Sequence, residues 1–412
     1  MSITSYPALV RIDESGNAIT VGGTSADAFG RLRSSMPFTI FDSQNRYAKN
    51  ELFDESTATG GAVSYLANES SVSMTTTTSS GSKVVRESKR VFSYQPGKSL
   101  LVMNTFVMGD AQANMRSRVG YFSTQNGVFF ERDGTTVNMV RRSYVTGSVV
   151  DTAVAQANWN GDRLDGTGES GFTLDTTKAQ ILWQDFEWLG VGSVRCGFVI
   201  NGKFIVCHTF NHANAISSVY MTTATLPIRY EIENTGTTAS TGSLKQICST
   251  VISEGGYERK VALHTVAMTA ANTNVTTSWM PLVSIRLDSA RLDSVIIPDG
   301  YCILPTSAST TTFELALIKN ATLTSPSWTQ STSDNVEYDM SATALTGGRM
   351  IYHNFALAST QINANTSNGS EYNFDIQLGR TLAGVSDTYT IAARALSGTH
   401  SAIGSMSFWD LT

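Results

Sequence analysis

The sequence predicts an all-β protein made of antiparallel sheets. Between residues 179 and 210 the chain reads as three extended segments, 181–188, 194–200 and 203–210, with no helical period. Only Asn201-Gly202 separates the last two segments, and this dipeptide is a strong hairpin signal because both turn positions need a positive φ. Charged residues make up only 15% of the 412 residues, and Ser, Thr, Asn and Gly replace them, which suits strands and tight turns. We therefore expect little helix.

The chain divides into three parts. Residues 1–55 have little capacity for a core of their own, and we expect an extended N-terminal arm. Residues 56–255 show extended segments at regular spacing with Gly-containing turns between them, the pattern of a β-sandwich. The strands expected there are 83–94, 99–108, 117–123, 128–132, 136–144, 147–155, 181–188, 194–200, 203–210, 226–233 and 244–253.

A second β-sandwich of jelly-roll length is expected after the Gly255-Gly256 pair, over residues 256–412. Apolar and polar residues alternate again in this part of the chain, as they do in half-buried strands. The strands expected there are 261–268, 279–287, 295–297, 313–318, 336–340, 350–357, 372–378, 389–393 and 403–409.

Charge and hydropathy exclude several classes of partner. The net charge is −5, whereas binding to a phosphate backbone needs clustered Lys and Arg, so we expect no nucleic acid partner. The first residues, MSITSYPALVRIDE, lack the cationic and apolar regions of a signal peptide. No run of about 18 apolar residues occurs, so we expect no membrane partner.

Four cysteines, Cys196, Cys207, Cys248 and Cys302, show no CxxC spacing. Cys196 and Cys207 flank the Asn201-Gly202 turn at equal offsets, so a disulfide between them is geometrically conceivable. Four cysteines in a chain of this length are not a disulfide framework. We interpret all four as buried thiols and leave the pairing of Cys196 with Cys207 open.

Two motifs that suggest cofactors stand in the wrong context. Residues 166–171 match GxGxxG, but a polar loop precedes them and an extended segment follows, whereas a dinucleotide site needs a strand before and a helix after. In the same loop Asp162, Asp165 and Glu169, with Asn160, offer hard oxygen ligands without the EF-hand spacing. We interpret the loop as a solvated turn and expect no cofactor.

His208 and His212 also fail as a metal site. On a strand the two side chains share a face about 13 Å apart, because each residue rises about 3.3 Å. This separation is too great for one ion, so we expect structural histidines and no bound metal.

The carboxylates Asp185 and Glu187 are the strongest enzyme-like signal. They share one face of the expected strand 181–188 with Trp183. The segment WQDFEWLG resembles the ExDxE strand of concanavalin-like family-16 glycoside hydrolases, and the resemblance implies a concanavalin-like first sandwich. In that family the first Glu is the nucleophile and the last is the acid/base, but Trp183 stands at the nucleophile position. We therefore expect no catalytic residue and no enzyme.

Two other interpretations of this strand stay open. In a lectin-like groove Trp183 would stack on a glycan, with Asp185 and Glu187 also facing it. Alternatively, the carboxylates are a surface or interface feature.

Apolar anchors are spaced along the arm at Phe29, Leu32, Phe38, Ile40 and Phe41. They must be buried either against a neighbouring subunit or against this chain's own sandwich. The residues expected to serve assembly are Phe29, Arg31, Leu32, Arg33, Phe38 and Phe41.

Six segments resemble a family of virion structural proteins of marine tailed bacteriophages. They are DAFGRLR…PFTIFDSQNRY, YQPGKSLLVMNTF, NGVFFERDG, WNGDRLDGTGESG, WLGVGSVRCGFVINGK and LPIRYEIENT. The resemblance implies a location in the virion after synthesis in the host cytoplasm, and no catalytic residue. We expect a non-enzymatic homo-oligomer, a trimer, that contacts other capsid or tail proteins and is exposed on the particle. Head decoration, fibre and tail roles stay open, as does host-surface glycan binding.

Overall fold

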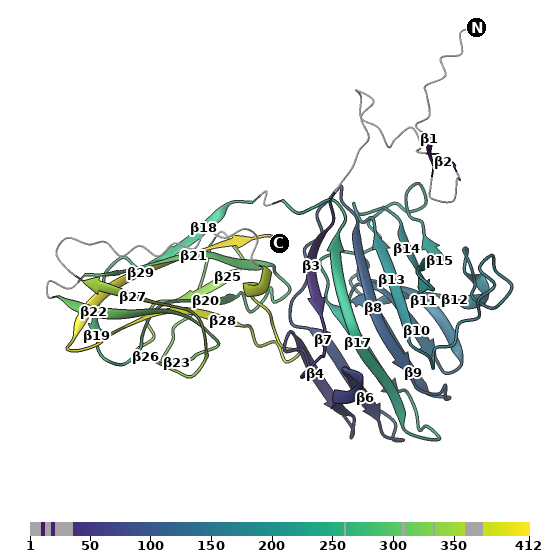
Figure 1. Cartoon of the computed structure of the whole chain (residues 1–412), viewed down its shortest axis with the longest axis horizontal. Helices are drawn as coiled ribbons and strands as arrows, with labels where there is room; N and C mark the ends of the chain where they lie inside the picture. Colours follow the sequence, from purple (N-terminus) through teal and green to yellow (C-terminus); the bar gives the residue numbers. More distant parts are fainter. Residues whose placement is uncertain are drawn as a thin grey trace, which may run out of the picture.

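The computed structural model describes residues 10–12, 18–20, 36–258, 261–306, 310–332, 334–358 and 374–412 (Figure 1). Strands account for 54% of the chain and helix for 2%, so the predicted all-β class is confirmed. The strand pairs are antiparallel, as in β10 with β11 and β20 with β28. The short hairpin of β1 (Val10–Ile12) and β2 (Ala18–Thr20) precedes the main body.

The first module is a sandwich of two sheets. The seven-stranded sheet has the order β12 (Val150–Ala155), β11 (Thr136–Ser143), β10 (Gly127–Asp133), β9 (Met115–Phe122), β16 (Ile228–Asn234), β7 (Lys83–Ser88) and β4 (Phe53–Ala58). The eight-stranded sheet has the order β15 (Lys203–Phe210), β14 (Val194–Ile200), β13 (Gln180–Phe186), β8 (Leu100–Met108), β17 (Gly242–Ser253), β6 (Ser71–Thr76) and β5 (Ala62–Leu66), and β3 (Phe38–Ser43) also pairs with β17. The outer face of each sheet is the face turned away from the core between the two sheets.

Burial follows a period of two along the strands, as a half-covered sheet requires. In β8 the residues alternate between buried and half-buried, and Val102, Phe106 and Met108 enter the core. Phe130 on β10 meets Phe106 and Phe198 from the opposite sheet, with ring centroids 5.9 and 5.3 Å away. These contacts fix the face that each strand buries.

The predicted hairpin at Asn201-Gly202 is confirmed. Asn201 has φ 51° and Gly202 φ 75°, and the turn joins β14 to β15. A register shift between Cys196 and Gly197 leaves Cys207 as an extra residue on β15. Cys196 and Cys207 are buried free thiols, whereas Cys248 and Cys302 are free but only half-buried, so the expectation of burial holds for two of the four.

The second module contains a six-stranded and a four-stranded sheet. The first has the order β24 (Thr329–Gln330), β25 (Val336–Asp339), β20 (Met280–Leu287), β28 (Thr388–Ala395), β22 (Thr311–Lys319) and β27 (Arg349–Ala358). In the second, β18 (Leu263–Ala267), β19 (Asn272–Val275) and β21 (Ile296–Pro305) all pair with β29 (His400–Asp410). β23 (Thr322–Thr324) and β26 (Ala344–Thr346) form a separate two-stranded antiparallel sheet.

The helices in the described residues are short 3₁₀ turns, η2 (Ala67–Glu69), η3 (Gln156–Asn158) and η4 (Phe374–Ile376). Of the strand expected at 372–378 the structure describes residues 374–378, and η4 shows that these do not form a strand. After η4, the Gln377 side chain donates to Val91 O at 2.8 Å, and Leu378 N donates to Ile296 O at 2.9 Å. This segment therefore bonds to two different parts of the molecule and forms no regular ladder.

The expected arm is described from residue 36 onward. Phe38 and Phe41 lie on β3, which pairs with β17, and Phe41 is buried in the core of the first module. This part of the arm therefore docks on the chain's own sandwich, one of the two expected ways of burying its anchors. Phe29, Arg31, Leu32 and Arg33 lie outside the described residues.

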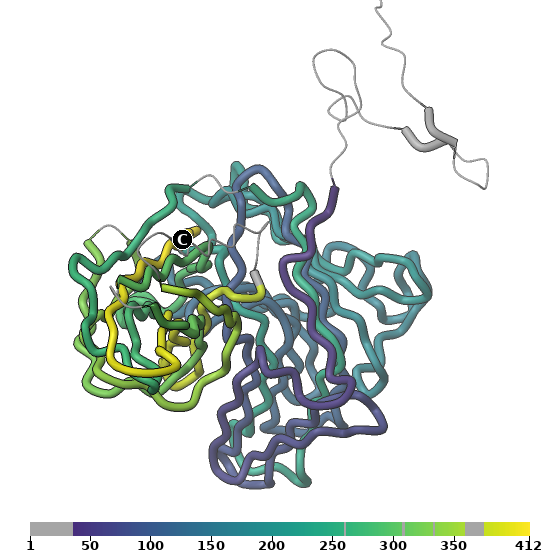
Figure 2. Tube along the Cα trace, turned by 60° about the vertical axis from the view of Figure 1, so that its left-hand side comes forward, coloured from purple at the N-terminus to yellow at the C-terminus, as the bar shows by residue number. Residues whose placement is uncertain are grey.

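The two modules lie side by side (Figures 1 and 2). Segment 375–382 of the second module runs along the first: Arg380 N donates to Lys89 O at 2.7 Å, and Leu382 N donates to the Asp54 carboxylate at 2.7 Å. Leu411 and Ile297 belong to the same apolar cluster as the core of the first module. The junction is therefore both polar and apolar.

Candidate functional site

Strand β13 carries the carboxylates that the sequence singled out, and its alternation is as predicted. Leu182 and Phe186 enter the core between the sheets. Gln184 points the same way and ties the two sheets together, because its Oε1 accepts from Tyr121 N at 3.1 Å and its Nε2 donates to Val128 O at 2.8 Å. Trp183 and Asp185 therefore lie on the outer face of the eight-stranded sheet.

Trp183 is covered although it lies on this outer face. Only 3% of the residue is exposed, and its ring meets that of Phe204 with centroids 5.5 Å apart. A Cβ at Gly197 would lie 3.0 Å from the indole nitrogen, so the indole packs against a glycine on the neighbouring strand. The lectin-like interpretation needs an open stacking platform at Trp183, but the exposed aromatic ring here is Phe204, at 55%.

Asp185 and Glu187 have separate local roles. Asp185 is buried and accepts from Nε of Arg195, its cross-strand partner on β14, at 2.9 Å. Glu187 lies beyond the end of β13, where its carboxylate accepts from Ser193 N at 3.2 Å and its own N–H donates to Ser193 O at 3.0 Å. The first carboxylate is ion-paired and the second closes a turn, so the two do not form a facing acid/base pair.

The polar loop with the GxGxxG match protects a sheet edge. Gly161 N donates to Cys207 O at 2.9 Å, along the free edge of β15. The Asn160 side chain imitates a strand residue there, because its Nδ2 donates to Thr209 O at 2.9 Å and its Oδ1 accepts from Thr209 N at 2.8 Å. Asp162 accepts from Leu164 N and Ser170 N at 2.8 and 2.7 Å, so its carboxylate orders the loop itself.

The two histidines are placed as structural residues. His212 Nδ1 lies 2.6 Å from Gly192 O, and the ring stacks on Tyr220 at 3.9 Å. Burial lowers the pKa of both His208 and His212. No group of three or more metal-ligating side chains occurs in the part of the chain that the structure describes.

The outer face of the seven-stranded sheet holds a row of charges that was not predicted from the sequence. Their sign alternates from strand to strand: Lys83 on β7, Glu231 on β16, Arg118 on β9 and Glu131 on β10. Glu231 Oε1 lies 3.0 Å from both Lys83 Nζ and Arg118 Nη1, and Arg118 Nε lies 2.8 Å from Glu131. We call these four residues and Arg229 the charge ladder. Its signal in the sequence is RYEIEN, where charged residues alternate with apolar ones.

The carboxylate at the centre of the charge ladder is held in its ionised form. Burial alone would raise the pKa of Glu231, but Arg229, Lys83 and Arg118 together lower it to about 2. Arg229 also lies 2.6 Å from Glu87. An acid of this pKa holds no proton to donate near neutral pH, so the Glu231 carboxylate holds the sheet together and is unsuited to general acid catalysis.

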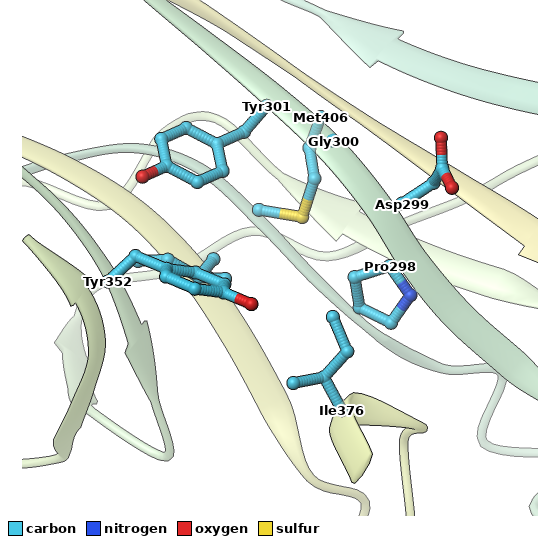
Figure 3. Close-up of a pocket in the computed structure, with 8 residues that line it drawn as sticks. Pro298, Asp299, Gly300, Tyr301, Tyr352, Ile376 and Met406 are labelled. Carbon is cyan, nitrogen blue, oxygen red and sulfur yellow. The ribbon is translucent and has the colours of Figure 1, made fainter. Parts of the chain in front are cut away.

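A small pocket lies inside the second module, where Tyr301, Tyr352, Met406, Pro298 and Ile376 surround it (Figure 3). Its volume is about 10 Å³, which is room for about one water molecule and for no substrate.

In the described part of the chain no helix is both long and apolar enough to cross a bilayer.

No protein-family model matches the sequence, and no curated protein matches it. Among solved structures, the Emp47p carbohydrate recognition domain is similar over 54% of this chain and 97% of its own, with 11% identity and a TM-score of 0.34. A β-1,3-glucanase from Mycobacterium marinum covers 52% of this chain and 98% of its own, with 10% identity and a TM-score of 0.36. Peanut lectin covers 53% and 98%, with 11% identity and a TM-score of 0.32. Similarities this weak carry no argument about the activity of this chain.

Proposed function

We propose that this chain is a non-enzymatic structural component of a tailed-phage virion, exposed on the particle as a head decoration, fibre or tail-associated protein. In this proposal the chain forms a trimer, and its N-terminal arm contacts other copies or other virion proteins. The observation that carries the proposal is that the carboxylates singled out as candidates are already engaged within the chain. Asp185 pairs with Arg195, and the Glu187 carboxylate accepts a hydrogen bond from Ser193 N.

The segments that resemble the virion family support the same proposal, because their polar residues build the fold. WNGDRLDGTGESG covers the edge of β15 through Asn160, and NGVFFERDG supplies Glu131 of the charge ladder. LPIRYEIENT supplies Arg229 and Glu231. Residues that are used in this way favour a durable particle component, which must keep its shape without turning over a substrate.

Mass spectrometry of purified tailed-phage particles from cultures that produce this chain tests the location. We expect the chain to co-purify with the particles through a density gradient, in amounts comparable to other structural proteins. A chain that stays in the soluble lysate and is missing from the particles would overturn the proposal.

The role of the arm needs a separate experiment. Deleting residues 1–35 leaves β3 intact, so the variant should fold, with unchanged circular dichroism, but should no longer assemble. Deleting residues 1–9 is the matched control, since Phe29 and Leu32 remain, and this variant should assemble normally. If the longer deletion assembles as well as the full chain, the arm is not the assembly element.

A second candidate function, binding to a host-surface glycan, is favoured by the exposed ring of Phe204 beside Trp183. A glycan array should then show binding that Phe204→Ala and Trp183→Ala both abolish. Phe355→Ala is the control, because that exposed ring lies on the second module. Hydrolysis is the least supported alternative; turnover of β-glucans that Glu187→Gln removes would be needed to revive it.

A further inference from the structure

A cleft opens between the two modules. Three adjoining cavities, of about 500, 220 and 220 Å³, share Leu52 and Arg90 in their walls. The first module contributes Leu52 and Arg90, and the second contributes Lys319, Ile351 and Tyr389 to the largest cavity. A volume of about 500 Å³ lies within the range of about 300–1,000 Å³ typical of small-molecule sites.

Three cations, Lys89, Arg90 and Lys319, line this junction cleft together with the carboxylates of Asp375 and Asp387. Arg349 and Glu51 pair at 2.6 Å, but their side chains are 69% and 74% exposed, so this pair belongs to the solvent-facing rim. Deeper in, the Lys319 side chain is only 20% exposed and lies 2.8 Å from Asp387. Lys89 is half-buried in the wall of one of the smaller cavities.

Arg90 is the most buried of these cations, and its charge has no counterion in contact. It is 5% exposed, and the hydrogen bond that its guanidinium makes is to the backbone carbonyl of Asp375. Among the described residues no carboxylate lies within 4.0 Å of this guanidinium. The buried Arg229, by contrast, contacts both Glu87 and Glu231. A buried charge is normally paired, so the guanidinium of Arg90 is expected to bind a negatively charged group from outside the chain.

The surroundings of Arg90 disfavour its charged form. Burial lowers the pKa of Arg90, and only the more distant Tyr389, Asp375, Asp387 and Glu51 oppose that effect. The guanidinium carries five N–H donors in a planar fork, and a single backbone carbonyl uses few of them. A planar carboxylate or a phosphate is the chemical group that such a fork binds in two places at once.

We propose that the junction cleft binds a small acidic ligand through a carboxylate or phosphate group held by Arg90, with Lys89 and Lys319 as further cationic contacts. The body of the ligand lies against the apolar walls formed by Leu52 and Ile351, beside the ring of Tyr389. This site is independent of the proposed virion role and of the strand that carries Trp183.

Isothermal titration calorimetry on the full chain tests the proposal with three probes at equal ionic strength. Inorganic phosphate and glucuronate carry the required group, and glucose is the neutral analogue of the second. We expect saturable binding of glucuronate or phosphate and none of glucose. Binding of phosphate alone identifies a free inorganic anion as the ligand, and binding of glucuronate identifies a carboxylated sugar. Binding of neither, or equal binding of glucose and glucuronate, overturns the proposal.

Two variants locate the binding site. Lys89→Gln should weaken binding about ten-fold, as expected when about 1.4 kcal/mol of a charge-assisted contact is lost, and Arg90→Gln should abolish it. Lys245→Gln on β17, whose side chain pairs with Glu69, is the control and should leave the affinity unchanged. Because Arg90→Gln also removes the contact to Asp375, its melting temperature is measured too, and Lys89→Gln decides if that variant fails to fold. Affinities that neither variant changes would place the binding elsewhere and refute the assignment.

Discussion

Replacing Glu231 by Gln should destabilise the first module because it removes the central anion of the charge ladder. The Glu231 side chain is 2% exposed and lies within 3.0 Å of Lys83, Arg118 and Arg229. Its pKa falls from the ordinary value of 4.5 to about 2. Each pKa unit corresponds to about 1.4 kcal/mol, so this lowering represents about 3 kcal/mol of folding stability near neutral pH.

The pH dependence follows from the direction of this pKa change. A carboxylate with a lowered pKa in the folded state stabilises the fold fully above pH 4.5, and this contribution is lost as the pH falls towards 2. The gap in unfolding free energy between wild type and Glu231→Gln should therefore be about 3 kcal/mol at pH 7 and close as the pH approaches 2.

Urea unfolding followed by tryptophan fluorescence at pH 7, 4 and 3 measures this gap. Glu69→Gln is the matched control, because the Glu69–Lys245 pair has side chains 52% and 32% exposed and should contribute almost nothing. A variant at Glu231 that is as stable as wild type at pH 7 would refute the reasoning, as would a gap that stays constant down to pH 3.

Three further outcomes can be checked. Gly197→Ala should lower the melting temperature by several degrees, because the new Cβ would lie 1.8 Å from a backbone oxygen. Gly300→Ala is the control and should not lower it, because open space surrounds Gly300. Equal melting temperatures of the two variants would contradict this prediction. Buried Cys196 and Cys207, whose pKa values burial raises, to about 12 for Cys207, should resist a thiol reagent at pH 8 until urea is added; rapid labelling of all four cysteines in the native chain would contradict this. Arg380→Ala should cost about 2 kcal/mol and split the calorimetric transition of the two modules, because it removes the buried ion pair of Arg380 with Glu87 of the first module. A single unchanged transition would show that the modules unfold together without this pair.

Local patterns in the sequence were enough to predict the strand-rich class and the hairpin at Asn201-Gly202. Period-two alternation and turn chemistry act between neighbouring residues, so they are visible in any single segment. The prediction of a strand at 372–378 was wrong because the structure of this segment depends on contacts with distant parts of the chain. Ile376 and Leu378 alternate as in a strand, but the partners of this segment, Val91 and Ile296, lie far away in the sequence.

The arrangement around the candidate sites could not be predicted in the same way. The charge ladder needs β16 to lie between β7 and β9, and Glu231 is far from both Lys83 and Arg118 in the sequence. The burial of Trp183 depends on Gly197 and Phe204 of neighbouring strands. The cleft around Arg90 exists only once the two modules have met.

The place of Leu411 in the core of the first module has a consequence for synthesis. Its N–H donates to Val295 O at 2.9 Å, its carbonyl accepts from the Ser93 hydroxyl at 3.3 Å, and its side chain is buried. A nascent chain on the ribosome exposes Ser253 long before it exposes Leu411, so one end of the first sandwich stays uncovered while translation continues. Ribosome stalling in the second module should therefore yield a protease-sensitive intermediate that recruits chaperones. Release of the completed chain should let Leu411 cover the open end of the first sandwich and restore protease resistance.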